Sequence, residues 1–314
     1  MAPQAPSGPA PGGLCFLSGA ALPERKSFPL TDLYVALATV LWGSDYLFAK
    51  IALREVSPVS FAAIRTLIST AAMLPFFLRR EPDWRVKPRH LAALLGLALL
   101  GTFANRIFWA AGMNLTTASN ASLLSTTSPI FVLIVSFFLL RASVTWQAAL
   151  GIFVSFLGVT LVIQGDWLEW ARGGGNVWGD LCMLLASLTW AFFTVLAKFL
   201  MKEYSSLKVT AYIMVIGSLL FLPFLGNDHP GGWSGVSTLG WLSVLYVAFT
   251  GNLMAYLLWM HGIQHIGPVR TIFYSYLTPV TAILLAVPFL NETLTPAQIG
   301  GALVVFVGVF LARS

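Results

Sequence analysis

Ten apolar runs, each about 20 residues long, constrain the fold of this chain more than any other feature of its sequence. They lie near residues 31–53, 57–78, 89–112, 118–140, 145–164, 177–200, 207–225, 238–261, 267–290 and 295–312. Hydrocarbon offers no partners to backbone N–H and C=O groups, so runs of this length are predicted to be helices and not barrel strands. Of the 314 residues, 57% are hydrophobic and 10% are charged, against about 25% charged in soluble domains. The sequence predicts an all-α membrane protein with ten transmembrane helices.

The segment before the first run has a different composition. Residues 1–29 are rich in Pro, Ala and Gly and are predicted to form a disordered cytoplasmic tail. No basic residue precedes the short apolar patch from Leu14 to Leu17, so this segment does not read as a signal peptide. Cys15 lies in the tail and Cys182 in the sixth run. We therefore expect no disulfide framework, no metal site and no cofactor.

Basic residues in the loops predict the orientation of the chain in the cell inner membrane. With a cytoplasmic amino terminus, the outside receives Arg54 and Arg172 alone. The inside then collects eleven basic residues, namely Arg25, Lys26, Arg79, Arg80, Arg85, Lys87, Arg89, Arg141, Lys202, Lys208 and Arg313. Both termini are predicted to be cytoplasmic, with residues 166–176 as an external linker. The net charge of +6 then reflects loops facing anionic lipid, and it gives no reason to expect a nucleic-acid partner.

The chain contains an internal duplication. A displacement of 150 residues places Trp109 on Trp259, Gly112 on Gly262, Pro129 on Pro279 and Gly158 on Gly308, and a displacement of 148 places Trp42 on Trp190 and Lys50 on Lys198. The copies are residues 30–165 and 177–314. Because five helices per copy is an odd number, we expect the copies to enter the membrane from opposite sides. Such an inverted repeat is typical of secondary transporters, whose substrate binds near the midplane.

Each copy has a proline in the middle of its fourth apolar run. Pro129 follows four hydroxyl residues in STTSPIFVLI, and Pro279 follows Thr278 in SYLTPVTAIL. A proline in a helix interior costs about 3 kcal/mol. A packing kink would explain each proline separately. The matched positions and the adjoining hydroxyls, which can bind freed carbonyls, favour a hinge or a cavity wall.

Three stretches carry a family resemblance. They are LWGSDYLFAKIALREVSPVSFAAIR (residues 41–65), GDLCMLLASLTWAFFTVLAK (179–198) and LNETLTPAQIGGALVVFVGV (290–309). The chain after residue 30 resembles the drug/metabolite transporter superfamily, in its ten-helix EamA-type branch. It departs from that pattern at Asp45, where a neutral residue is more common, and at residues 141–145, which lack the counterpart of Glu292. The resemblance implies export of small organic metabolites by alternating access. Amino acids lead, because length and tryptophan content are similar to those of bacterial aromatic amino-acid exporters.

Polar residues recur on one face of three predicted helices. The sets are Thr102, Asn105 and Trp109, then Asn252, Tyr256 and Trp259, then Arg270, Tyr274 and Leu277. A polar stripe on a membrane helix faces either a partner helix or a wet cavity. Three stripes on spans that carry or precede the prolines favour one shared cavity. Trp42 and Trp190 lie too deep for the interfacial belt, which leaves a pocket wall or core packing.

An amino acid needs a cation for its carboxylate, acceptors for its ammonium group and an apolar wall for its side chain. Arg106 or a helix terminus could meet the first need, and Asn105, Asn252 and the tyrosines the second. The predicted substrate-binding residues are Trp42, Tyr46, Asn105, Arg106, Trp109, Trp190, Asn252, Tyr256, Trp259 and Tyr274, with Pro129 and Pro279 as hinges. Two further expectations are that Arg65 pairs with Asp45 or Glu55, and that Lys50 and Lys198 extend to the membrane interface.

Other functions are less well supported by the sequence. It lacks a clustered ligand set, a nucleophile elbow and a phosphate-binding loop, which weighs against an intramembrane enzyme. No short re-entrant segment indicates a channel. A nucleotide-sugar, sugar-phosphate or drug transporter of the same superfamily is the nearer alternative. Glycines at 151, 158, 301 and 308 permit close helix contact, either within the chain or in a homodimer.

Overall fold

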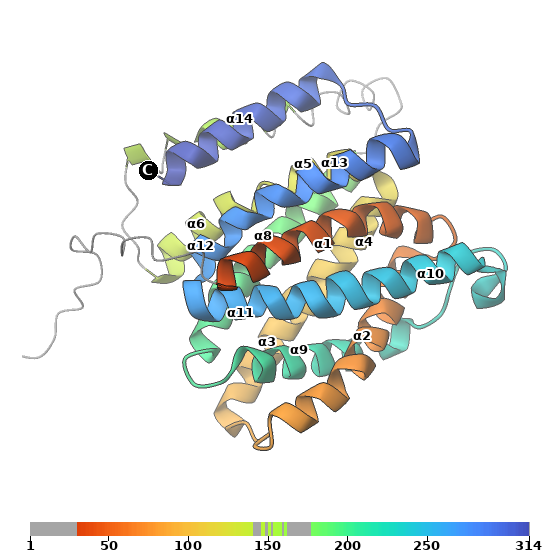
Figure 1. The fold of residues 1–314 in the computed structure, drawn as a ribbon, viewed down its shortest axis with the longest axis vertical. Helices are drawn as coiled ribbons and strands as arrows, with labels where there is room; N and C mark the ends of the chain where they lie inside the picture. Colours follow the sequence, from red (N-terminus) through yellow and green to blue (C-terminus); the bar gives the residue numbers. More distant parts are fainter. Residues whose placement is uncertain are drawn as a thin grey trace, which may run out of the picture.

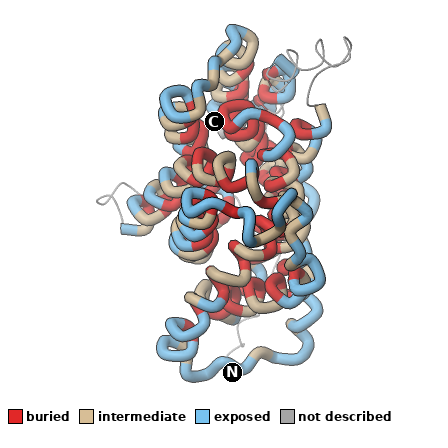
Figure 2. Tube along the Cα trace, turned by 90° about the vertical axis from the view of Figure 1, so that its right-hand side faces the viewer, coloured by how far each residue is buried: buried red, intermediate tan, exposed pale blue. Residues whose placement is uncertain are grey.

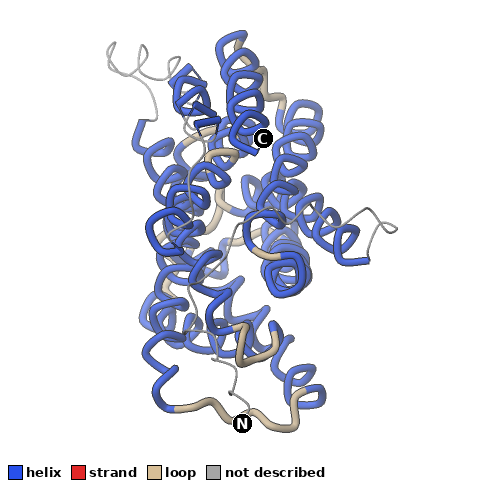
Figure 3. The backbone as a smooth tube through the Cα atoms, turned by 90° about the vertical axis from the view of Figure 1, so that its left-hand side faces the viewer, coloured by secondary structure: helices blue, strands red, loops and turns tan. Residues whose placement is uncertain are grey.

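The computed structural model of the protein describes residues 30–140, 146–147, 150–151, 153–158, 160–161 and 177–313. Within these ranges the regular structure is helical, and no strand occurs (Figure 3). The prediction of an all-helical chain is therefore confirmed for the described part. The expectations for residues 1–29 and for the linker 166–176 fall outside it.

In the first copy, the helices are α1 (Leu30–Ala52), α2 (Pro58–Arg80), η1 (Pro88–His90), α3 (Leu91–Ala98), η2 (Leu99–Ala104), α4 (Asn105–Leu115), α5 (Ala118–Ser125) and α6 (Ser128–Leu140). In the second copy they are α8 (Val177–Leu200), α9 (Ser206–Phe221), η3 (Leu222–Phe224), η4 (Gly232–Gly235), α10 (Thr238–Val247), η5 (Ala248–Ala255), α11 (Tyr256–Ile266), α12 (Pro268–Phe273), η6 (Tyr274–Tyr276), α13 (Leu277–Leu290) and α14 (Pro296–Arg313). The segments η2 and η5 are π-helical.

Eight stretches are long and apolar enough to cross a membrane, among the residues the structure describes. They coincide with eight of the ten predicted runs. The tenth run forms α14, whose apolar part is Pro296–Gly308 and is shorter than a full span. The fifth run, 145–164, lies largely outside the described residues.

The helices run back and forth so that α1 begins at the same side of the molecule as α14 ends, the left side in Figure 1. Large apolar side chains cover the outer surface. Phe138, Leu284 and Phe310 are 72%, 69% and 71% exposed, while buried residues line the inner faces of the helices (Figure 2). Exposed apolar area on this scale fits a surface covered by lipid.

The first helix of each copy packs against the other copy. α1 contacts α10, α11 and α13, and α8 contacts α4, α5 and α6. Both core clusters draw residues from both copies: Phe61 lies in one with Phe221, and Met73 in the other with Trp259. Neither copy buries its own apolar surface alone.

Residues at matched positions of the two copies touch each other. The rings of Trp42 and Trp190, which are 148 residues apart, meet edge to face with centroids 5.4 Å apart. The hydroxyl of Ser218 donates to that of Thr70 at 2.8 Å, again across 148 residues.

Each fourth span is broken just before its proline. Between α5 and α6, the hydroxyls of Thr126 and Thr127 donate to the carbonyls of Leu123 and Leu124 at 2.6 and 2.8 Å. Pro129 is the second residue of α6, where a helix needs no N–H donor from it. The interior-helix cost of proline is therefore avoided.

The second copy has a related break. The 3₁₀ turn η6 (Tyr274–Tyr276) precedes α13, and Pro279 is the third residue of that helix. The hydroxyl of Ser275 donates to the carbonyl of Ile272 at 2.6 Å. In both copies hydroxyl groups near the proline donate to carbonyls of the preceding turn. The carbonyls of Leu123 and Leu124 also accept backbone N–H groups, so they are not carbonyls that the proline leaves free.

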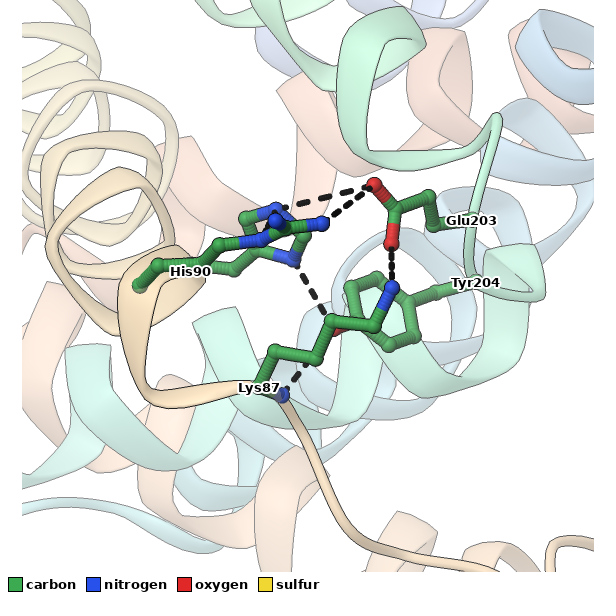
Figure 4. A network of polar contacts seen from close by, with 5 residues as sticks. Lys87, His90, Glu203 and Tyr204 are labelled. Carbon is green, nitrogen blue, oxygen red and sulfur yellow. Dashed lines mark hydrogen bonds and ion pairs between the residues drawn. The ribbon is translucent and has the colours of Figure 1, made fainter.

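Two loops tie the copies together at their ends. Lys87, in the loop after α2, donates to Glu203 at 2.5 Å, and His90 Nδ1 lies 2.9 Å from the Tyr204 hydroxyl (Figure 4). The hydrogen bond from Lys87, and then the neighbouring positive charges, hold the pKa of Glu203 below its usual value. The matched Glu55 instead accepts from the N–H and hydroxyl of Ser237, at 2.6 and 2.8 Å.

Lys50 and Lys198 also have matched roles, and their extension to the membrane interface stays a prediction. Lys50 Nζ donates to the carbonyls of Met113 and Thr116 at 2.7 and 2.5 Å. Lys198 Nζ donates to the carbonyl of Gln264 at 2.8 Å. Each lysine donates hydrogen bonds to the last carbonyls at the carboxyl end of the third span of its own copy, where the helix dipole favours a positive charge.

The repeated glycines lie in a helix contact within the chain. A β-carbon on Gly158 would overlap Val305 of α14, and one on Gly308 would overlap Ser155 and Gly151. Close contact of glycines between these helices therefore needs no second copy of the chain. A homodimer remains a prediction.

Candidate substrate cavity

A cavity of about 130 Å³ lies between the two copies, well above the 10–15 Å³ that a single water needs. Nine of the ten residues that the sequence proposed for substrate binding line it. They are Trp42, Tyr46, Asn105, Arg106, Trp109, Trp190, Asn252, Tyr256 and Trp259. They come from α1, α4, α8, η5 and α11, so the first and third spans of both copies supply these nine residues.

Aromatic rings form one wall of the cavity. Trp42 lies 4.9 Å from Trp259 and 5.4 Å from Trp190, measured between ring centroids. Tyr46 meets Trp109 edge to face at 5.4 Å. The indole N–H of Trp42 donates to the Gly251 carbonyl at 3.0 Å, which fixes the ring. Offset and edge-to-face contacts of this kind hold a rigid apolar surface.

Each third span contains a π-helical segment beside its polar cavity residues, and Asn252 lies within the segment of the second copy. Asn105 and Arg106 follow η2, and Tyr256 follows η5. Each segment contains a glycine, Gly101 and Gly251, at positions 150 residues apart. A π turn adds a residue to the helix and re-aims the side chains after it, which is why such turns occur at functional sites.

Each of these glycines accommodates a side chain from the first helix of the other copy. A β-carbon on Gly251 would overlap the carboxylate of Asp45, and one on Gly101 would overlap the ring of Phe193. Asp45 and Phe193 are themselves 148 residues apart. The same close approach is therefore made twice, once with a carboxylate and once with a phenyl ring. Oδ1 of Asp45 also accepts from the Thr250 hydroxyl at 2.7 Å.

Two buried guanidinium groups line the cavity. The Arg106 guanidinium carbon lies 5.3 Å from the ring centre of Tyr256, its matched residue, and that of Arg65 lies 4.6 Å from the ring centre of Trp109. Stacking on a ring leaves the in-plane N–H donors of a guanidinium available.

The expected pairing of Arg65 with Asp45 or Glu55 does not take the form of a direct ion pair. The described residues contain no ion pair between Arg65 and either carboxylate. Asp45 binds Thr250, and Glu55 binds Ser237. Arg65 faces the cavity instead.

Tyr274 is the one proposed binding residue that is not among those lining the cavity. Its hydroxyl donates to Asp32 at 2.6 Å, and Arg270 forms an ion pair with the same carboxylate at 3.0 Å. These contacts hold the start of α12 and η6 against the start of α1. Pro279 lines a second cavity, beside Leu123.

Several lining residues were not proposed from the sequence: Arg65, Ser125, Ser128, Ser187, Ser275 and Thr278. The hydroxyl residues beside the prolines were noticed for their carbonyl contacts, and that spacing was also the signal for a place in the cavity wall. No described group of three or more His, Cys, Asp or Glu side chains could hold a metal ion.

The sequence profile of the EamA-like transporter family matches this chain twice, over residues 29–164 and 177–314. The chain belongs to the EamA-like transporter family. The two matches confirm the internal duplication.

Relatives of this EamA-like transporter occur in archaea and bacteria. An uncharacterized transporter of Archaeoglobus fulgidus is 26% identical over 90% of this chain and 97% of its own length. The uncharacterized transporter YyaM of Bacillus subtilis is 28% identical over 90% and 93% of the two chains. The uncharacterized inner membrane transporter YedA of Escherichia coli K12 is 27% identical over 87% of each chain.

A solved structure described as "Crystal structure of protein" shares the fold of this EamA-like chain. Its TM-score is 0.65 at 19% identity, covering 90% of this chain and 96% of the other. The protein is thus a multi-pass membrane transporter of the drug/metabolite transporter superfamily, and it acts on a small-molecule substrate from within a lipid bilayer.

Proposed function

We propose that the protein exports small amphiphilic metabolites by alternating access, with bulky neutral amino acids, aromatic ones above all, as the leading substrates. The single observation that carries this proposal is the cavity between the copies. It combines an aromatic wall of Trp42, Trp190 and Trp259 with the buried guanidinium of Arg106. An amphiphile with a carboxylate and an apolar body satisfies both.

The proposal includes ten transmembrane helices arranged as two inverted five-helix repeats. Its support is the contact of matched residues, Trp42 with Trp190, Thr70 with Ser218 and Arg106 with Tyr256. Residues exchanged by a twofold axis meet where that axis passes between them. Such an axis in the membrane plane lets one copy adopt the inward-facing shape while the other adopts the outward-facing shape.

Pro129 and Pro279 are proposed as hinges. Each lies in the first turn after a break in a fourth span, beside hydroxyl groups that donate to carbonyls of the preceding turn. Bending at such a break leaves few backbone groups unpaired. Alanine at either position should leave folded protein in the membrane and slow transport, and normal transport rates in both variants would remove the hinge role.

Both termini are proposed to be cytoplasmic. A cysteine at Gly174 should then react with an impermeant maleimide on intact cells, whereas a cysteine at Trp84 should not. The opposite labelling pattern would reverse the orientation.

The substrate class is tested with purified protein in liposomes. Phenylalanine and tryptophan should compete for transport better than a nucleotide sugar, a sugar phosphate or a cationic drug. Preferred transport of a phosphorylated sugar would replace the amino-acid proposal with the superfamily alternative. A flux that does not saturate with concentration would favour a channel.

A further inference from the structure

The side chains around the cavity carry an excess of positive charge. Arg65 and Arg106 line it, at 5% and 6% exposure, and no Asp or Glu occurs among its described lining residues. The charge of Asp45 acts on both arginines, but its carboxylate binds Thr250 and packs against Gly251. With Asp45 ionised the three side chains sum to +1, and with Asp45 protonated to +2. A buried excess charge is costly until a ligand neutralises it.

One edge of a guanidinium group is left without partners. Nε and Nη2 of Arg106 are both buried and form no hydrogen bond with the described residues, and the same holds for Nε of Arg65. Nε and Nη2 lie on the same side of a guanidinium and bind a carboxylate through two parallel hydrogen bonds. The ring of Tyr256 lies near this guanidinium, so Arg106 has a stacking partner and still lacks an acceptor.

The possible acceptors for an ammonium group are neutral. Asn105 donates through Nδ2 to the Ala186 carbonyl at 2.8 Å, and Asn252 donates to Ser69 at 3.3 Å. Their amide oxygens, with nearby hydroxyl groups, could accept a hydrogen bond but could not balance a charge. An ammonium group would therefore add to the positive excess of the cavity.

We infer that the cavity selects an aromatic or bulky apolar monocarboxylate, which Arg106 binds side-on, and that an α-ammonium group contributes nothing to its affinity. The inference rests on the proposed function in one respect, since it takes this cavity as the site of transport. Within that function it moves the leading substrate from amino acids to organic anions, because a zwitterionic amino acid leaves the excess charge in place and an organic anion removes it.

Calorimetry on the full chain in lipid nanodiscs tests the inference with four compounds that share a phenyl ring. These are 3-phenylpropanoate, phenylalanine, 3-phenylpropanamide and phenyl phosphate. We expect 3-phenylpropanoate to bind at least as tightly as phenylalanine. It should bind at least about tenfold tighter than the amide, the factor that corresponds to one charge-assisted hydrogen bond.

Variants assign the preference to Arg106. Arg106→Gln should bring the carboxylate and the amide to within about threefold of each other, since the charge and the fork are both lost. Arg106→Lys retains the charge and should keep part of the preference. Arg54→Gln, at an exposed arginine beyond the end of α1, is the control and should bind all four compounds as the unaltered protein does.

Each other outcome overturns the inference. Phenylalanine binding tenfold tighter than 3-phenylpropanoate would show that the ammonium group is recognised. Equal binding of carboxylate and amide, tightest binding of phenyl phosphate, or binding of none of the four would each remove the monocarboxylate site. The proposed function fails separately: 3-phenylpropanoate that binds but is not transported in liposomes would contradict transport and leave the binding site standing.

Discussion

Asp45 in the first copy and Phe193 in the second occupy equivalent places, each against a glycine in the π-helical segment of the other copy. Arg65 and Ile213 are also at matched positions of the two copies, 148 residues apart, and so are Arg106 and Tyr256, 150 residues apart. At all three pairs the first copy has a charged side chain and the second an uncharged one.

Other matched pairs have kept their chemistry. Lys50 and Lys198 bind carbonyls at the ends of third spans, and Trp42 and Trp190 meet edge to face in the cavity wall. The difference separates two tasks. The shared residues build a symmetric frame, which alternating access requires, whereas the charges of one copy give the cavity its chemical preference.

The largest effect is expected from filling the two glycine positions. In Gly101→Ala the new methyl group overlaps the buried ring of Phe193, and in Gly251→Ala it overlaps the carboxylate of Asp45. Overpacking at such sites costs about 3 kcal/mol, the upper end of the usual range. Thermal unfolding in detergent should show a similar loss in both variants.

Gly96→Ala is the matched control, because a β-carbon there meets nothing within 4 Å. It should be as stable as the unaltered protein or slightly more stable, since alanine favours a helix. A loss in Gly96→Ala equal to the loss in the other two would show that the π-helical glycines have no special packing role.

A smaller loss is expected when the lysines are replaced. Lys50→Met and Lys198→Met each leave carbonyls at the end of a third span without a charged donor, at a cost of about 1.5 kcal/mol. Lys50 donates to three carbonyls and Lys198 to two, so Lys50→Met should have the lower unfolding temperature. Lys202 is exposed, so Lys202→Met serves as the control. If Lys198→Met and Lys202→Met lowered the unfolding temperature equally, the shared capping role of Lys50 and Lys198 would be contradicted.

The aromatic wall should respond in binding more than in stability. Trp42→Ala and Trp190→Ala each remove one ring from an edge-to-face pair, worth about 0.5–1.5 kcal/mol, so affinity should fall about three- to tenfold. Calorimetry with 3-phenylpropanoate measures the loss. Trp178→Ala removes a ring of the same helix as Trp190 that is 69% exposed, and it should leave the affinity unchanged. If only one of the two variants bound 3-phenylpropanoate more weakly, the two tryptophans would not contribute equally to the wall.

The smallest effect concerns Glu203, which lies at the surface. Its pKa is lowered chiefly by the hydrogen bond from Lys87, so its stabilising contribution exists above the ordinary value of 4.5 and is lost as the pH falls through the lowered value. The unfolding temperature of Glu203→Gln should lie slightly below that of the unaltered protein at pH 7, and the difference should vanish in acid and in high salt. A difference that grows in acid would contradict this ion-pair role.

The duplication and the apolar runs were readable from the sequence because rare residues such as Trp42 and Trp190 keep their spacing. Helical periodicity also brought Asn105 and Trp109 to one face. The same periodicity placed Thr102 on that face, but Thr102 is buried and is not among the residues that line the cavity. Thr102 lies within η2, and a π turn breaks the 3.6-residue phase on which the prediction relied.

Two errors came from contacts between distant segments. Tyr274 was placed in the cavity because it shares a spacing with Arg270, but both bind Asp32, which is more than 200 residues away. Arg65 was assigned to a carboxylate because its charge needed a partner. Sequence spacing along one helix does not reveal which helix of the other copy faces it.

The most direct test of the account is counterflow of labelled 3-phenylpropanoate in liposomes, compared between the unaltered protein and Arg106→Gln at equal amounts of folded protein. We expect saturable exchange in the unaltered protein and at least about a tenfold slower exchange in Arg106→Gln. Equal exchange in both would contradict it, because the substrate would then cross the membrane without using the charge that the first copy places in the cavity.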